Sequence, residues 1–233
     1  GVDLAIESAP DATTLLKFRR LLEQHNLTLS MFEAINAYLA EQGLLLRQGT
    51  VVDATLIAAA PSTKNKEKAR DPEMKQTKKG NQWYFGMKTH VGADAATGLV
   101  HSVAVSAASE GDVTRLHELL HGEEKMVIGD AGYTGAEGRE ELQHLEDVTW
   151  CIAEKRGRIK SIPEWSPFRV VVEEFERAKA SLRAPVEHVF HIMKCRFGHR
   201  KARYKGLAKN EAQMYSLLGL GNLLLAERWL SRT

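Results

Sequence analysis

Residues 50–57 read TVVDATLI, a stretch dominated by β-branched residues that predicts a buried strand. One acid, Asp53, stands in the middle of it. An ionised carboxylate at such a position costs several kcal/mol unless a cation or good hydrogen bonds compensate its charge. Asp53 is therefore either a structural acid bonded to a neighbouring loop or an acid with a functional role.

Two more strands are expected on the carboxyl side of this stretch, at residues 83–92 and 99–107. The turn-forming residues 94–98 separate them, so that residues 50–57 and these two strands form a β-meander. A polar, Lys-rich loop is predicted at residues 61–82. At its end, Trp83 and Phe85 face either DNA or the core.

The second half of the chain alternates helix and strand. Asp112 is expected to cap a short helix that ends at Leu120, and the apolar strand MVIGD ends at Asp130. The remaining elements are predicted as a helix at 137–145, a strand at 148–153, a long helix at 172–193 and a closing helix at 207–230 that packs on the core. The order βββαβαβα, a three-strand meander followed by two αβ crossovers, predicts an α/β protein with an RNase-H-like mixed sheet.

Residues 1–48 are interpreted as a helical N-terminal segment and residues 49–233 as one catalytic domain with C-terminal helices. Asp11 is expected to cap the first helix, and Ser30 with Glu33 resembles a capping box for the second, which stops at Gly43. This helix pair is either the remnant of a DNA-binding domain or a packing element, and we favour packing. Because the first residue is Gly1 rather than Met, we expect the segment to be truncated.

The predicted long helix carries a cation, an acid and a second cation on one face. Glu187 and Lys194 follow Arg183 by 4 and 11 residues. At about 100° per residue these offsets lie within roughly 40° of one another. An exposed Arg183–Glu187 pair is the simpler explanation, but it is worth only about 0.2–0.5 kcal/mol and does not account for Lys194.

Three acids from two strands and a helix, Asp53, Asp130 and Glu187, suit a pair of hard divalent cations, which prefer oxygen ligands. We expect Mg²⁺, with Mn²⁺ as a substitute. Two such ions hydrolyse a phosphodiester by activating water and stabilising the leaving oxygen. His188 and His191 stand close to Glu187 in the sequence, but no HExxH motif accompanies them and zinc is not expected.

Charge is segregated along the chain although the net charge is only +2. Residues 107–147 contain eleven acids and three bases, whereas residues 188–210 contain seven bases and no acid. Local basic stretches with interleaved aromatic residues favour a nucleic acid as the partner, against the alternative of solvated surface charge. The expected DNA contacts are Lys78, Lys79, Arg183, Lys194, Arg200, Lys201 and Arg203.

Four stretches together resemble a bacterial insertion-sequence transposase of the DDE superfamily, in particular the insertion-sequence-five group. They are GTVVDATLIAAAPSTKNK, RDPEMKQTKKGNQWYFGMKTHVGADAATGLVHSV, GDAGYTG and RAPVEHVFHIMKCRFGHRKARYKGLAKN. The resemblance implies that Asp53, Asp130 and Glu187 are the catalytic triad and the Mg²⁺ ligands. It also implies DNA cleavage at element ends, strand transfer into target DNA and an active homo-oligomer. A Tyr that related sequences carry three residues before the Arg is replaced here by Ala180.

Composition limits the alternatives. The chain is 43% hydrophobic and 27% charged, as expected for a globular protein. No apolar run approaches the roughly 18–20 residues of a membrane helix, and no secretory signal is evident, so we expect a cytoplasmic protein without a membrane partner. The remaining alternatives are a metal-dependent nuclease that does not join DNA and a non-catalytic DNA-binding remnant.

Overall fold

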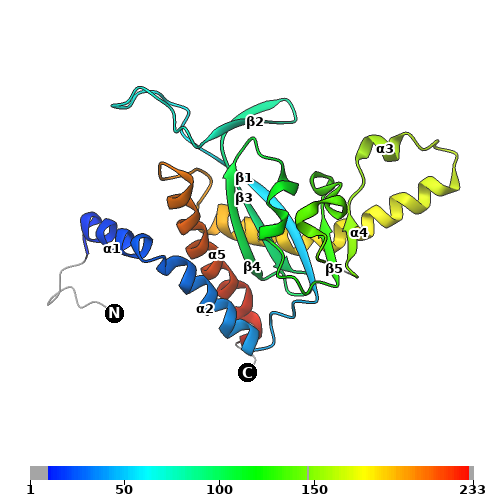
Figure 1. Ribbon diagram of the computed structural model, residues 1–233, viewed down its shortest axis with the longest axis horizontal. Coiled ribbons are helices and arrows are strands. Elements are labelled where there is room, and N and C mark those ends of the chain that lie inside the picture. Colours follow the sequence, from blue (N-terminus) through cyan, green and yellow to red (C-terminus); the bar gives the residue numbers. More distant parts are fainter. Residues whose placement is uncertain (1–9, 146, 231–233) are drawn as a thin grey trace.

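The computed structural model describes residues 10–145 and 147–230, which are built around a six-stranded mixed sheet (Figure 1). Strand β3 (Gln82–Asp94) pairs antiparallel with both β1 (Gly49–Ala58) and β4 (Val100–Ala107). On its other edge β1 pairs in parallel with β5 (Met126–Gly129), and β5 pairs in parallel with β6 (Thr149–Ile152). The order β4-β3-β1-β5-β6 is the predicted meander followed by two parallel strands, and the RNase-H-like α/β fold is confirmed.

Strand β2 (Lys75–Lys79) lies within the segment that was predicted to be a loop. It pairs antiparallel with the start of β3, and Gly80, at φ 62°, makes the tight turn between them. The loop prediction was wrong here because β2 is polar and mostly exposed, so no apolar alternation marks it. Backbone pairing with β3 supplies its order instead.

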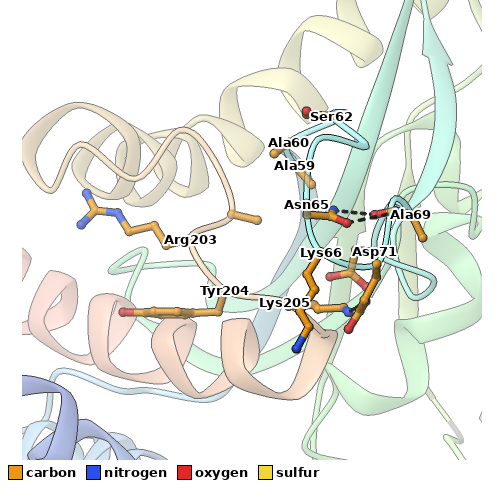
Figure 2. A pocket seen from close by; sticks show the side chains of 12 residues that line it. Ala59, Ala60, Ser62, Asn65, Lys66, Ala69, Asp71, Arg203, Tyr204 and Lys205 are labelled. Carbon is orange, nitrogen blue, oxygen red and sulfur yellow. Dashed lines mark hydrogen bonds and ion pairs between the residues drawn. The ribbon is translucent and has the colours of Figure 1, made fainter.

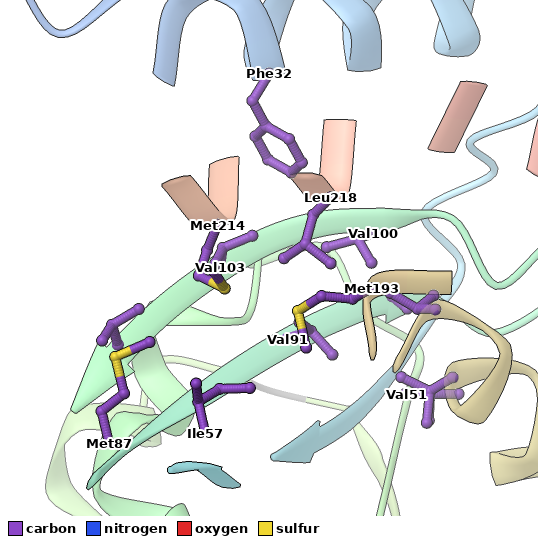
Figure 3. Packing of buried hydrophobic residues seen from close by; sticks show 14 of the residues in the cluster. Phe32, Val51, Ile57, Met87, Val91, Val100, Val103, Met193, Met214 and Leu218 are labelled. Atoms are coloured by element: carbon purple, nitrogen blue, oxygen red, sulfur yellow. The ribbon is translucent and has the colours of Figure 1, made fainter. Parts of the chain in front are cut away.

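Helices α1 (Ala12–Gln24) and α2 (Leu27–Glu41) precede the sheet, and α2 lies beside the closing helix α5 (Leu207–Leu230) (Figure 1). In Figure 3, Phe32 of α2 reaches toward Leu218 of α5, and both stand over the sheet. The alternative of a packing element is therefore confirmed for α2, and the predicted core role of the closing helix is also confirmed.

The helix ends follow the predictions in part. Asp11 caps α1 by accepting a hydrogen bond from the backbone N–H of Thr14 at 2.6 Å. The predicted capping box at Ser30 was wrong, because α2 already begins at Leu27, after Asn26 in a left-handed conformation. The Ser30 hydroxyl donates instead to the Asn26 carbonyl one turn back, an option that serine has inside a helix.

A long helix, α4 (Pro167–His191), follows the short α3 (Arg156–Lys160). It starts earlier than predicted because proline suits the first helical position, where no N–H partner is needed. Its N-terminal part projects away from the sheet with α3, and its C-terminal part runs across the sheet (Figure 1). At Ile192–Arg196 the helix continues as a π-helical turn. No helix within the described ranges has the length and apolar character needed to cross a bilayer.

The two predicted crossover helices are replaced by short 3₁₀ turns. Residues 112–120 contain η1 (Asp112–Glu118), which follows Gly111, so Asp112 does not cap it. Residues 131–142 form three single turns, η2 (Ala131–Tyr133), η3 (Ala136–Gly138) and η4 (Glu140–Leu142). Only a few of their side chains, such as Leu116 and Leu142, are buried against the sheet, and Gly138 disfavours a continuous helix.

Alternation along β1 decides which way Asp53 projects. Val51 and Ile57 belong to the apolar cluster that includes α4 and α5, whereas Val52 belongs to the cluster on the opposite face with η1 and η2. Because successive strand residues point to opposite faces, Asp53 and Thr55 project on the α4 side. The central acid of the sheet therefore faces the helix that carries Arg183 and Glu187.

Candidate active site

An open cavity of about 460 Å³ lies where β1, β5 and α4 meet the β2–β3 hairpin. The three predicted catalytic acids all line this cavity, one from each of β1, the end of β5 and α4. Its charged lining consists of Asp53, Asp112, Asp130, Glu187, Lys78, Lys79, Lys88 and Arg183. The structure thus places four acids opposite four bases around one open space.

The side chain of Asp53 is 16% exposed, less than the 24% of Asp112. One carboxylate oxygen accepts a hydrogen bond from the backbone N–H of Ala54 at 2.7 Å. Burial raises the pKa of Asp53 to about 6. The Ala54 hydrogen bond and the charge of Arg183 oppose this shift, while the charges of Asp130 and Asp112 add to it. The charge of Asp53 is therefore poorly compensated by the protein.

Asp130 follows β5 directly, at the carboxyl end of the strand. Its Oδ1 accepts a hydrogen bond from the backbone N–H of Gly132 at 2.8 Å and so caps the turn η2. A Cβ atom added at Gly132 would lie only 2.8 Å from this same oxygen. The glycine in the sequence GDAGYTG thus lets the chain turn tightly around the Asp130 carboxylate.

Arg183 reaches Asp53 from α4, with 4.0 Å between its Nε and Asp53 Oδ2. The same Nε is buried and makes no hydrogen bond with the described residues. Arg183 thus pairs across the cavity rather than with Glu187, which argues against the simple surface pair along the helix. Glu187 lines the same cavity but is exposed.

Lys194 lies beside the cavity without lining it. The π-helical turn carries Lys194 to β1, where its Nζ donates a hydrogen bond to the hydroxyl of Thr55. Thr55 itself lines the cavity. Burial lowers the pKa of Lys194, and the charge of Lys79 lowers it further. Lys194 therefore contacts the cavity lining through Thr55 but does not itself line the cavity with Arg183 and Glu187. Its role as a phosphate contact stays a prediction.

Of the other predicted DNA contacts, Lys78 and Lys79 line the cavity, whereas Arg200, Lys201 and Arg203 do not. Arg200 donates a hydrogen bond from Nε to the carbonyl of Lys194 at 3.2 Å. The backbone of Lys201 forms an isolated β-bridge with Ala58 at the end of β1. Arg203 lines a second hollow of about 400 Å³ beside residues 59–71, and Figure 2 shows its guanidinium pointing away from that loop. Their role in DNA binding remains a prediction.

The two aromatic residues at the start of β3 separate. Trp83 is 65% exposed, whereas Phe85 packs against the main core. Only Trp83 is therefore free to contact DNA.

Sequence reasoning missed two residues of the cavity, Lys88 and Asp112. Lys88 Nζ donates to Asp112 Oδ1 at 2.9 Å and to the Glu110 carbonyl at 2.7 Å. Asp112 was expected to cap a helix, yet its side chain points to β3. A signal was present, because a lysine within an otherwise buried strand needs an acidic partner.

The acidic side chains that line this cavity are of the type that a hard divalent cation prefers as ligands. All of these side chains offer oxygen ligands, and the one cation paired with the Asp53 carboxylate among the described residues, Arg183, stands 4.0 Å away. Within residues 10–145 and 147–230, however, no three His, Cys, Asp or Glu side chains converge closely enough to hold a metal on their own. His188 and His191 lie at the end of α4 and do not line the cavity.

A protein-family model described as a transposase DDE domain matches residues 45–223. The chain belongs to this family. The match begins just before β1 and ends within α5, so it includes the whole sheet and every charged residue of the cavity. DDE transposases bind DNA, break and join phosphodiester bonds, and generally depend on divalent metal ions. The expectation of a transposase acting in DNA recombination is therefore confirmed.

Proposed function

We propose that this transposase cleaves DNA at the ends of an insertion sequence of the insertion-sequence-five group and joins the freed 3′ ends to target DNA. The observation that carries the proposal is the largely buried carboxylate of Asp53, which lines a solvent-open cavity together with Asp130 and Glu187. Cleavage and joining are both in-line phosphoryl transfers, so that one site can serve both.

Asp53, Asp130 and Glu187 are the residues that would hold Mg²⁺ or Mn²⁺. The bound ions supply an activated attacking oxygen and stabilise the leaving oxygen. The carboxylates come from the middle of β1, from the end of β5 and from the long helix α4, an arrangement that favours a fixed geometry. Cation binding also offsets the cost of burying Asp53, which supports the assignment.

Lys78, Lys79 and Arg183 provide positive charge on the same cavity wall. Their role in the proposal is to neutralise the DNA phosphates next to the scissile bond. Arg183 has a buried Nε without a hydrogen-bond partner among the described residues, and a phosphate oxygen would satisfy it. Lys194 is held by Thr55 at the edge of the cavity and extends this positive rim.

Two alternatives remain, a nuclease that cuts without joining and a DNA-binding remnant without activity. A protein that only bound DNA would gain nothing from an acid buried in its central strand, since replacing it would remove the cost of desolvation. The cavity thus favours catalysis over binding alone. We further propose that the active form is a homo-oligomer that holds two DNA ends in the bacterial cytoplasm.

A strand-transfer assay with labelled element-end DNA, a target plasmid and Mg²⁺ tests the proposal. Joined products are expected from the wild type and none from Asp53→Asn. Nicked DNA without joined products would favour the nuclease, and binding without cleavage would favour the remnant.

A further inference from the structure

Asp112 is an acid of the cavity to which the proposed catalytic set assigns no role. It lies on η1, remote in sequence from the three proposed catalytic acids, and it lines the same cavity. Lys88 holds only one of its carboxylate oxygens, Oδ1. The other oxygen, Oδ2, makes no hydrogen bond with the described residues.

The free oxygen of Asp112 lies close to Asp130. A Cβ atom placed on Gly132 would be 3.2 Å from Asp112 Oδ2 and 2.8 Å from Asp130 Oδ1. The two oxygens therefore flank one glycine and cannot be farther apart than the sum of these distances. Two oxygens that bind one hard cation from opposite sides are separated by roughly 4–5 Å, which is within this limit.

Two buried polar groups without hydrogen-bond partners accompany these acids. The hydroxyl of Tyr133 makes no hydrogen bond with the described residues, although the side chain is 0% exposed. Burial raises its pKa, and the charges of Asp112, Asp53 and Asp130 raise it further. His90 Nδ1 is likewise buried without a hydrogen bond, 3.8 Å from Asp112 Oδ1. Buried polar groups without partners are rare and call for an explanation such as an ion or a water molecule.

We propose that Asp112 is a fourth carboxylate of the cation site, which binds a divalent cation together with Asp130 through Oδ2 while its Oδ1 stays bonded to Lys88. The inference rests on the proposed function, since it concerns the same cavity. It explains why Lys88 bonds only one carboxylate oxygen and leaves the other available.

The rival explanation is that Asp112 serves only to neutralise Lys88 within the sheet. Two substitutions separate the explanations, because Asp112→Asn and Lys88→Met break the same ion pair but change the charge of the cavity in opposite directions. If Asp112 binds the cation, Asp112→Asn weakens Mn²⁺ binding by about tenfold or more, an effect typical of residues that support a metal site. Lys88→Met then tightens Mn²⁺ binding, because a competing positive charge is gone. Glu118→Gln is the matched control, since Glu118 is an exposed acid on the same turn and does not line the cavity.

The experiment is calorimetric titration of the full chain with Mn²⁺, with urea unfolding of each variant to confirm that it folds. Wild-type affinity in Asp112→Asn, or equal weakening by both substitutions, would overturn the inference. If Asp112→Asn does not fold, the substitution is made together with Lys88→Met, which leaves no lysine unpaired. Weaker Mn²⁺ binding by this double variant than by Lys88→Met alone supports the inference, and equal binding overturns it. Asp53→Asn is titrated in parallel. Loss of binding there with normal binding in Asp112→Asn refutes only the present inference, whereas normal binding in Asp53→Asn, or no binding by the wild type, also refutes the proposed cation site.

Discussion

Replacing Asp53 by Asn is expected to make the metal-free protein more stable at neutral pH. Burial raises the pKa of Asp53 from 3.8 to about 6, so the folded protein binds this proton more tightly than the unfolded chain does. The free energy of unfolding therefore falls as the pH rises from about 4 to about 6 and then levels off. A pKa difference of about two units between the folded and unfolded states lowers the free energy of unfolding by at most about 3 kcal/mol.

The asparagine variant should escape this loss. Its side-chain oxygen can still accept the hydrogen bond from Ala54, and it carries no charge that must be desolvated. The ion pair with Arg183, at 4.0 Å, is long and adds little to the wild type. We expect the difference in free energy of unfolding, variant minus wild type, to increase by up to about 3 kcal/mol between pH 4 and pH 7.5.

Urea unfolding in EDTA, followed by tryptophan fluorescence between pH 4 and pH 8, measures this difference. Equal m-values for the two proteins are required for the comparison. Adding Mn²⁺ should then stabilise the wild type but not the variant. Glu187→Gln is the matched control, because it removes an exposed acid from the same cavity. Parallel pH profiles for wild type and Asp53→Asn would refute the conclusion that Asp53 is buried at a cost.

Three further variants test the rest of the proposal. Lys194→Ala should leave the melting temperature close to that of the wild type but reduce DNA cleavage roughly ten- to a hundredfold, the loss of one charge-assisted hydrogen bond; a normal cleavage rate would remove its role as a phosphate contact. Gly132→Ala places a methyl group 2.8 Å from Asp130 Oδ1 and should lower the cleavage rate without unfolding the protein, whereas an unchanged rate would show that the position of Asp130 is not critical. Replacing Arg200, Lys201 and Arg203 together by Ala should weaken the salt dependence of DNA binding. The slope of log K against log salt concentration should become smaller by about 0.9 for each lost phosphate contact. An unchanged slope would assign these three residues to the solvated surface.

The sequence predicted secondary structure best where packing against the core requires apolar residues at a regular spacing. β1 and the C-terminal part of α4 pack apolar side chains against one core, and their β-branched and helical patterns predicted both elements. Strand β2 carries no such pattern, because it is polar and ordered by backbone pairing. The 3₁₀ turns between β4 and β6 bury too few side chains to distinguish them from a helix in sequence.

The candidate site likewise contains residues that a sequence pattern marks and residues that it does not. Asp53, Asp130 and Glu187 were predicted from their places within or at the end of recognisable elements, and all three line one cavity. Lys194 lies on a π-helical turn, so its direction cannot be read from the regular helical period. The contact of Lys88 with Asp112 joins a strand to a turn that sequence reasoning took for a capped helix. Such contacts depend on the tertiary fold and leave only a weak local signal.

The position of bound Mn²⁺ tests the central claim most directly, because the account rests on Asp53, Asp130 and Glu187 forming one cation site. Anomalous diffraction from crystals soaked in Mn²⁺ locates the ions without reference to activity. We predict anomalous peaks within the cavity, in contact with the carboxylate oxygens of Asp53 and Asp130. Peaks only elsewhere, for example on His188 and His191, or a cavity without a peak at saturating Mn²⁺, would contradict the account.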